Sequence, residues 1–253
     1  MEPGKETPDE SDRFSAGVAT SYSYMKFKAY YKYFNFILKH WDFSLAAFTV
    51  YHEMIGEKKY GIDTTGTEPL WQYDIDEADL SEAEAYQPSS YYILEKVFAS
   101  LPPEASKGRL IDFGCGKGRA LAVAMAYGFT KLTGIDIIYE LAKDAESNIL
   151  NCKYYQPGVS FNIINNRAQD VDVSDDTTVF LFFNPFKETV MKDVVQNIME
   201  SYHREPRKIF VVYINDVYKN LFLDLGFRQH FHVQKLTYLQ GTVLLLDMPS
   251  HIS

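Results

Sequence analysis

From residue 86 onward, short apolar runs alternate with segments in which apolar residues recur every three or four positions. The runs predict buried β-strands, and the periodic segments predict helices with one apolar face. Strands are expected at "RLIDF", "KLTGIDI", "VSFNII", "TVFLFF" and "KIFVVYI", and the helices between them begin near Gly118, Glu140 and Lys187. Alternation of this kind builds a parallel sheet with helices on both faces.

The pattern changes toward the C-terminus. A helix is expected near residues 217–225, followed by the strands "FRQHFHVQKL" and "GTVLLLDM" with a short link around residues 238–240. A link that short closes an antiparallel hairpin, because a parallel crossover needs about a dozen residues or more. We therefore predict that residues 86–253 form an α/β domain. Its Rossmann-like, mostly parallel seven-stranded sheet has helices on both faces and an antiparallel C-terminal strand.

Residues 21–85 are expected to form a helical N-terminal appendage and an acidic linker. Residues 22–55 contain many aromatic side chains and neither Gly nor Pro, which predicts helix, with a break near residues 41–44. Charged residues interrupt the apolar pattern too often for a membrane span. Two interpretations stay open. The helical segment packs on the main domain, which we favour, or its aromatic and lysine side chains contact a membrane surface or a partner.

The remaining N-terminal sequence is polar. Residues 1–20 predict a disordered tail without the apolar core of a signal peptide. Residues 74–84 carry six acidic side chains and no Lys or Arg, which predicts a solvated segment, with contact to a basic partner as the alternative. The net charge of −9 disfavours nucleic acid as a partner. The two cysteines lack metal-site or disulfide spacing, so we predict no metal site and a cytoplasmic location.

A glycine-rich turn carries the candidate chemistry. It reads "LIDFGCGKGR" over residues 110–119, with Gly114, Gly116 and Gly118 following Asp112. Dinucleotides favour G-x-G-x-x-G spacing and place a phosphate on the turn, where a carboxylate would repel it. Asp112 would instead attract an ammonium group, such as the amino-acid end of S-adenosylmethionine. Lys117 and Arg119 could favour a phosphate, but the interpretation we favour is that they are solvated side chains at the start of the helix.

The end of the second predicted strand supports the same cofactor. Asp136 lies about one strand–helix unit beyond the glycines, where an acid can accept hydrogen bonds from both ribose hydroxyls. "LIDFGCGKGR" followed by "LTGIDI" resembles the first two motifs of the class I S-adenosylmethionine-dependent methyltransferases, over about residues 86–247. "YGIDTTG", "YQPSSYYIL", "FGCGKGRAL", "FLFFNPF" and "VVYIN" together resemble, more narrowly, a group of uncharacterised bacterial methyltransferases.

The resemblance implies roles for individual residues. Asp112 and the turn Gly114-Cys115-Gly116, with Gly118, would line the methionine and ribose side, Asp136 would hold the ribose, and Ile137 would pack on the adenine. In the third motif, "NNRAQD", Ala168 fits the family, but Arg167 stands where the family has an acid, so Gln169, Asp170 or the backbone would contact the adenine. The segment that contains Tyr86 and Ser89 resembles one that closes over the cofactor in related lysine methyltransferases. The alternative is a helix cap after a proline turn.

Asn184, Pro185 and Phe186 follow the fourth predicted strand. They resemble the Asn/Asp-Pro-Pro-Tyr/Phe motif of enzymes that methylate amino or amide nitrogens, and that motif implies catalytic roles for them. The second proline is missing, and Lys187 replaces the aromatic residue. The alternative is a turn beside the cofactor.

The sequence thus predicts an enzyme that transfers a methyl group from S-adenosylmethionine to an acceptor, with a nitrogen of a protein or small molecule as the candidate. Two rivals stay open, a non-catalytic cofactor-binding module and a dinucleotide-dependent oxidoreductase.

Overall fold

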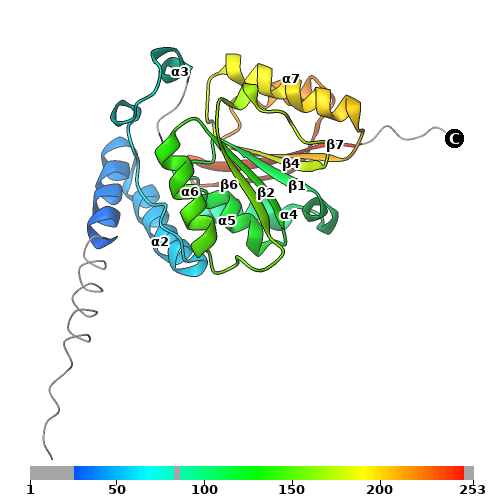
Figure 1. Ribbon diagram of the computed structural model, residues 1–253. Coiled ribbons are helices and arrows are strands. Elements are labelled where there is room, and N and C mark those ends of the chain that lie inside the picture. Colours follow the sequence, from blue (N-terminus) through cyan, green and yellow to red (C-terminus); the bar gives the residue numbers. More distant parts are fainter. Residues whose placement is uncertain (1–25, 83–85, 248–253) are drawn as a thin grey trace, which may run out of the picture. The chain divides into compact units, whose positions relative to one another are not determined.

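The computed structural model describes residues 26–82 and 86–247 (Figure 1). The chain forms two compact units that divide between Val50 and Tyr51. The boundary falls inside helix α2, Phe43–Tyr60. The predicted tail, residues 1–20, lies outside the described residues, as does the end of the last predicted strand. In the described part of the chain, no helix is both long enough and apolar enough to cross a membrane.

The first unit contains a helix over residues 26–40 and the first turns of α2. The predicted break between them is confirmed at residues 41–42. Asp42 ends the break, because its Oδ1 accepts a hydrogen bond from the backbone N–H of Leu45 at 2.8 Å. This contact satisfies one of the free N–H groups at the start of α2.

The second unit is built on a seven-stranded sheet with the order β3-β2-β1-β4-β5-β7-β6. Strand β7 runs antiparallel to both of its neighbours, and the other pairs are parallel. The predicted fold class is therefore confirmed. The strands are β1 Arg109–Phe113, β2 Lys131–Asp136, β3 Ser160–Asn165, β4 Thr177–Phe182, β5 Ile209–Ile214, β6 Arg228–Lys235 and β7 Leu239–Leu246.

Helices cover both faces of the sheet (Figure 1). One face packs on α4, Tyr91–Ser100, α5, Arg119–Ala126, and α6, Tyr139–Asn151. The other packs mainly on α7, Glu188–Arg204. The short elements are η1 Leu70–Gln72, α3 Glu77–Glu82, η2 Pro103–Lys107, η3 Ala168–Asp170 and α8 Asn220–Leu223.

The helix expected near residues 217–225 is shorter than predicted. Only α8 is helical, and turns flank it on both sides. Asn215 and Gly226 have φ angles of 55° and 92°, outside the helical region, and they bracket the segment.

The strand order determines where a ligand can bind. The chain runs outward from β1 to β2 and β3 on one side, and from β4 to β5 on the other. In an open parallel sheet, ligands bind at the carboxyl ends of the strands where this order reverses. The loops that follow β1 and β4 are therefore placed to form the site.

Candidate active site

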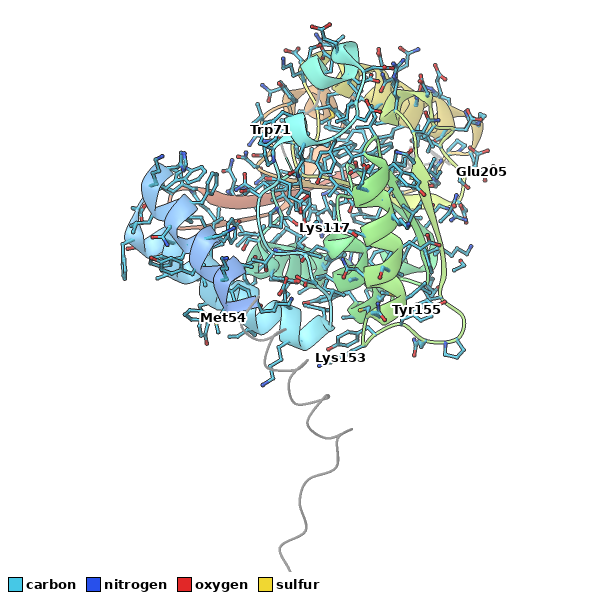
Figure 2. The ribbon with its side chains drawn as sticks, turned by 60° about the vertical axis from the view of Figure 1, so that its left-hand side comes forward. Met54, Trp71, Lys117, Lys153, Tyr155 and Glu205 are labelled. Atoms are coloured by element: carbon cyan, nitrogen blue, oxygen red, sulfur yellow. The ribbon has the colours of Figure 1, made fainter. Side chains whose placement is uncertain are left out.

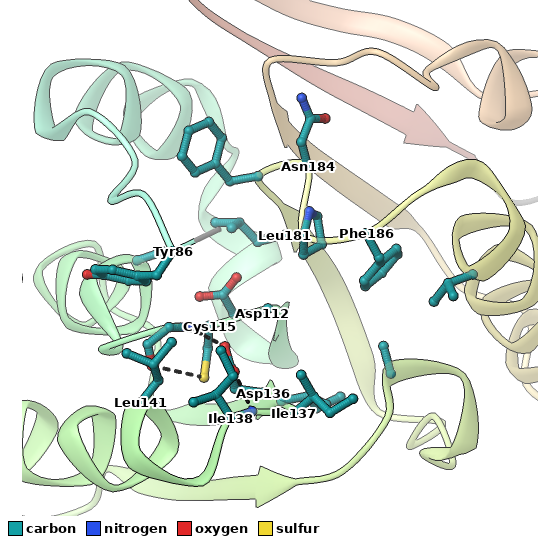
Figure 3. A pocket seen from close by; sticks show the side chains of 18 of the residues that line it. Tyr86, Asp112, Cys115, Asp136, Ile137, Ile138, Leu141, Leu181, Asn184 and Phe186 are labelled. Carbon is teal, nitrogen blue, oxygen red and sulfur yellow. Dashed lines mark hydrogen bonds between the residues drawn. The ribbon is translucent and has the colours of Figure 1, made fainter. Parts of the chain in front are cut away.

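A pocket lies at the carboxyl ends of β1, β2 and β4 (Figure 3). All but two of the residues predicted for the site line it: Tyr86, Ser89, Asp112, Gly114, Cys115, Gly116, Asp136, Ile137, Ala168, Gln169, Asn184, Pro185 and Phe186. The exceptions are Asp170, which is exposed, and Gly118, which caps α5 with a φ of 77°. A Cβ on Gly118 would lie 3.1 Å from Ala145, so this glycine allows α5 and α6 to pack closely.

The other two glycines of the turn are enclosed by neighbouring loops. Gly114 and Gly116 have φ angles of 74° and 50°. A Cβ on Gly114 would lie 2.2 Å from the Cβ of Pro185, and one on Gly116 would lie 2.4 Å from the ring of Tyr86. Neither position tolerates a side chain without a shift, so the backbone itself forms this wall of the pocket.

Asp112 is a buried acid at the end of β1, and its side chain lines the pocket. Among the described residues, no cation or hydrogen-bond donor contacts its carboxylate. Burial, with repulsion from Asp136 as the second cause, raises the pKa of Asp112 to about 8. A nearby positive charge stabilises the ionised form of a carboxylate. Asp112, buried and without a partner, therefore favours a cationic ligand.

Asp136 is also buried, but it already has partners. Its carboxylate accepts the backbone N–H groups of Gly116 at 2.7 Å and Ile138 at 2.9 Å. Burial raises the pKa of Asp136 to about 6, and the two hydrogen bonds oppose that rise. A carboxylate has about four acceptor sites, so Asp136 can still accept hydrogen bonds from a ligand.

A family model described as "Methyltransferase domain" matches residues 85–221, more than half of the chain. The chain belongs to this methyltransferase family. The methyl donor is S-adenosylmethionine, as predicted. The pocket fits it, since two buried acids beside the backbone of the glycine turn suit a ligand with an ammonium group, ribose hydroxyls and no phosphate. The family match also decides against the dinucleotide-dependent oxidoreductase.

Solved structures of methyltransferases resemble the chain at low sequence identity. An S-adenosylmethionine-dependent methyltransferase from Leishmania major is 13% identical with a TM-score of 0.46, covering 60% of this chain and 69% of its own. A putative one from Listeria monocytogenes is 11% identical with a TM-score of 0.47, covering 62% and 99%. One from Aquifex aeolicus is 14% identical with a TM-score of 0.44, covering 67% and 93%. A comparison with curated protein sequences finds no match.

Arg119 of the methyltransferase is buried, and the expectation of a solvated side chain was wrong. Its guanidinium binds Glu53 of α2 through two contacts of 2.6 and 2.5 Å. Its Nε donates to Thr64 Oγ1 at 2.8 Å, and its Nη1 donates to the carbonyl of Ser89 at 2.7 Å. Burial alone would lower the pKa of Arg119, but the ion pair with Glu53 raises it, so Arg119 stays charged. Arg119 thus fastens α2 and two loops to the helix that follows the glycine turn.

Lys117, whose position Figure 2 labels, also has protein partners, so the expectation that it is solvated was wrong as well. Its ammonium group forms an ion pair with Glu68 and lies 5.6 Å from the centre of the Tyr86 ring. Burial alone would raise the pKa of Glu68. Its hydrogen bonds, first of all the one from Lys117, outweigh burial and lower that pKa. The loop that follows α2, which contains Glu68, is tied to the glycine turn by this ion pair. The hydroxyl of Tyr86 adds one more contact, since it donates to the carbonyl of Thr64 at 2.8 Å.

The acidic segment is only partly solvated. Asp79 and Glu82 of α3 line the pocket. Asp79 pairs with Arg167, the residue that replaces the family's acid, at 2.8 Å. The interpretation of this segment as a plain solvated surface therefore missed two lining residues. One signal in the sequence could have predicted this contact. Arg167 interrupts the third motif, and an arginine at the edge of a pocket usually pairs with an acid from another part of the chain.

The loop after β4 forms the opposite wall. Asn184 has a φ of 39°, and its Oδ1 is buried without a hydrogen-bond partner in the described part of the chain. Pro185 packs on Gly114, and Phe186 packs edge-on against Phe182 with ring centres 6.4 Å apart. Figure 3 shows the side chain of Asn184 extending away from Asp112 and Asp136. The loop therefore offers a polar atom that is separate from the two acids.

Proposed function

We propose that the methyltransferase transfers the methyl group to a nitrogen atom of a protein or small-molecule acceptor. The observation that carries this proposal is the buried, unpartnered Oδ1 of Asn184. Most buried polar atoms have a hydrogen-bond partner, and an exception in a pocket indicates a partner that arrives with a ligand. The backbone of Asn184 supports a functional role, since positive φ at a residue other than glycine is often found at active sites.

A second unpartnered oxygen points to the same chemistry. Glu82 Oε2 is buried without a partner among the described residues, and Glu82 also lines the pocket. Both atoms are hydrogen-bond acceptors, so the group that satisfies them must be a donor. A primary amine or a primary amide offers at least two N–H donors, whereas a hydroxyl offers one O–H donor. The two acceptor oxygens therefore favour nitrogen as the methylated atom.

The residues around the glycine turn would hold the cofactor. When bound, S-adenosylmethionine supplies a methyl group that its sulfonium has already activated. We assign Asp112 to the cofactor's ammonium group, Asp136 to the ribose hydroxyls and Ile137 to the adenine. The backbone of the turn would approach the cofactor closely, because Gly114 and Gly116 carry no side chain there. Alignment then does most of the catalysis, so no acid–base pair is needed.

The charge of the chain guides the choice of acceptor. A net charge of −9 and two acids of α3 at the pocket disfavour a nucleic-acid acceptor, whose phosphates they would repel. We infer that the acceptor is a protein or a small molecule. The narrower resemblance to one bacterial group and the cytoplasmic location stay predictions.

The test replaces Asn184 with glycine. This change removes the side-chain amide with its Oδ1, and glycine tolerates the positive φ at this position. Transfer of label from radiolabelled S-adenosylmethionine is first screened over the protein and small-molecule fractions of a lysate. With an acceptor in hand, Asn184→Gly should lower turnover roughly a hundredfold, as expected for the loss of a positioning contact. Its affinity for S-adenosylhomocysteine should change only a few-fold by calorimetry.

Asn166→Gly is the matched control, because Asn166 lines the same pocket but has a backbone partner, the N–H of Arg167. It should leave turnover nearly unchanged. A large loss of cofactor affinity in Asn184→Gly would place Asn184 on the cofactor and end the nitrogen-orienting role. If no lysate fraction accepts label although the cofactor binds, the proposal of a protein or small-molecule acceptor loses its support, and the non-catalytic binding module becomes the favoured alternative.

A further inference from the structure

The helix over residues 26–40 presents two parallel rows of side chains. Phe27, Tyr31, Phe34 and Leu38 are spaced by four, three and four positions, so they share one face of the helix. We call them the aromatic row. Lys28, Lys32 and Lys39 follow the same spacing one position later, with Asn35 between the second and third. They form a lysine row directly beside the aromatic row.

Both rows face outward. Phe27 is 69% exposed and Tyr31 is 62% exposed, and Leu38 is exposed as well. All three residues of the lysine row are exposed. Phe43 extends the aromatic row beyond the helix, since it is 66% exposed and its ring centre lies 5.9 Å from that of Phe34. Two large apolar side chains at this exposure are not core residues, and side by side they form an apolar patch.

The charge of this helix is opposite to that of the whole chain. Residues 26–40 contain four lysines and no Asp or Glu, whereas the chain as a whole carries a net charge of −9. A basic strip beside an apolar strip matches a lipid surface, where anionic headgroups lie next to acyl chains. A nucleic-acid duplex would bind the lysines but would leave the aromatic row exposed, because its bases are stacked inside the duplex, and the net charge of the chain disfavours nucleic acid in general. A helix of this length extends about 22 Å, too short to cross a bilayer but long enough to lie along it.

We propose that the aromatic and lysine rows bind an anionic membrane surface and hold the methyltransferase there. The aromatic row enters the boundary between headgroups and acyl chains, and the lysine row pairs with anionic headgroups. The proposal does not depend on the nitrogen acceptor, because lipid binding is measured without methyl transfer.

The first experiment sediments the full chain with vesicles of phosphatidylcholine, with or without one quarter phosphatidylglycerol. We expect binding to the anionic vesicles and much weaker binding to the neutral ones. Replacing Lys28, Lys32 and Lys39 together with glutamine should weaken it roughly a hundredfold, since each lysine near an anionic surface contributes about fivefold. The double change Phe27→Ser and Tyr31→Ser should abolish it.

Matched controls come from exposed residues elsewhere. Replacing Lys96, Lys143 and Lys192 together with glutamine removes the same charge, and these side chains are exposed outside the helix. Trp71→Ser removes an aromatic side chain that is 81% exposed (Figure 2) but lies outside the aromatic row. Both controls should keep vesicle binding. Circular dichroism and the affinity for S-adenosylhomocysteine check that every variant is folded.

A second measurement reports on the helix directly. The chain has two tryptophans, Trp41 and Trp71, so Trp71→Phe leaves Trp41 as the single emitter beside the rows. Its emission should move to shorter wavelength with anionic vesicles. The proposal is overturned if anionic vesicles neither bind the chain nor shift this emission, or if the control triple weakens binding as much as the lysine-row triple. It is equally overturned if the double change Phe27→Ser and Tyr31→Ser leaves vesicle binding intact.

Discussion

Two pairs of buried acids flank the glycine turn, and they differ in what surrounds them. Glu53 and Glu57 of α2 have protein partners: Glu53 binds Arg119, and Glu57 accepts the backbone N–H groups of Thr64 and Thr65 at 2.8 Å. Asp112 and Asp136 of the sheet have no cation partner in the described part of the chain. A buried charge is costly unless it is paired. We infer that the helix acids stabilise the fold, and the proposed role of the sheet acids is to bind the cofactor.

The largest effect is expected at Arg119. Arg119→Met leaves Glu53 buried without its cation and should lower the free energy of unfolding by about 3–5 kcal/mol. Urea denaturation measures the change. Replacing Glu53 with methionine as well should restore much of the loss, because removing both charges of a buried pair is far less costly than removing one. If Arg119→Met weakens cofactor binding and leaves stability unchanged, Arg119 serves to bind the cofactor, and the proposed difference between the helix acids and the sheet acids is wrong.

An intermediate effect is expected at Asp136. Asp136→Asn removes the negative charge from a residue assigned to two ribose hydroxyls. A hydrogen bond to a charged group contributes about 1.5–3 kcal/mol, so affinity for S-adenosylhomocysteine should fall at least tenfold. Asp172→Asn, which changes an exposed acid that does not line the pocket, is the calorimetric control. Unchanged affinity in folded Asp136→Asn would show that this acid serves only the backbone N–H groups of Gly116 and Ile138.

The smallest effect is expected at the other arginine of the pocket. The side chain of Arg167 is 43% exposed and that of Asp79 is 17% exposed, against 4% for Arg119 and 1% for Glu53. Solvent screens an exposed pair, so Arg167→Gln should leave the urea midpoint unchanged. A loss of stability as large as that of Arg119→Met would remove the distinction between the two arginines.

Local sequence patterns predicted most of the fold and the sheet side of the site. The strand runs, the glycine turn and the short hairpin link depend on neighbouring residues, and the structure contains all three. The ion pairs were missed, because Arg119 and Glu53 are 66 positions apart and Arg167 and Asp79 are 88 apart. One indication was present. The segment that Arg119 begins, "RALAVAMA", is otherwise apolar on all sides, and a charged residue in a buried helix requires a partner.

The central claim is that Asp112 is kept unpaired for the cofactor's positive end, and proton release tests it most directly. The pKa of Asp112 is raised to about 8, so most molecules carry a proton there at pH 7. A bound ammonium group lowers that pKa and expels the proton, so affinity should rise roughly tenfold per pH unit up to about pH 7 and level off above pH 8. The pKa of Asp136 is raised only to about 6, so Asp136 affects the pH dependence of cofactor affinity mainly below pH 7.

Calorimetry of S-adenosylhomocysteine binding at pH 7, in two buffers of different ionisation enthalpy, gives the number of protons released. The account predicts about one proton for the natural chain and none for Asp112→Asn, whose affinity should also lose its rise toward pH 8. Equal proton release from the two chains, or none from either, would contradict it.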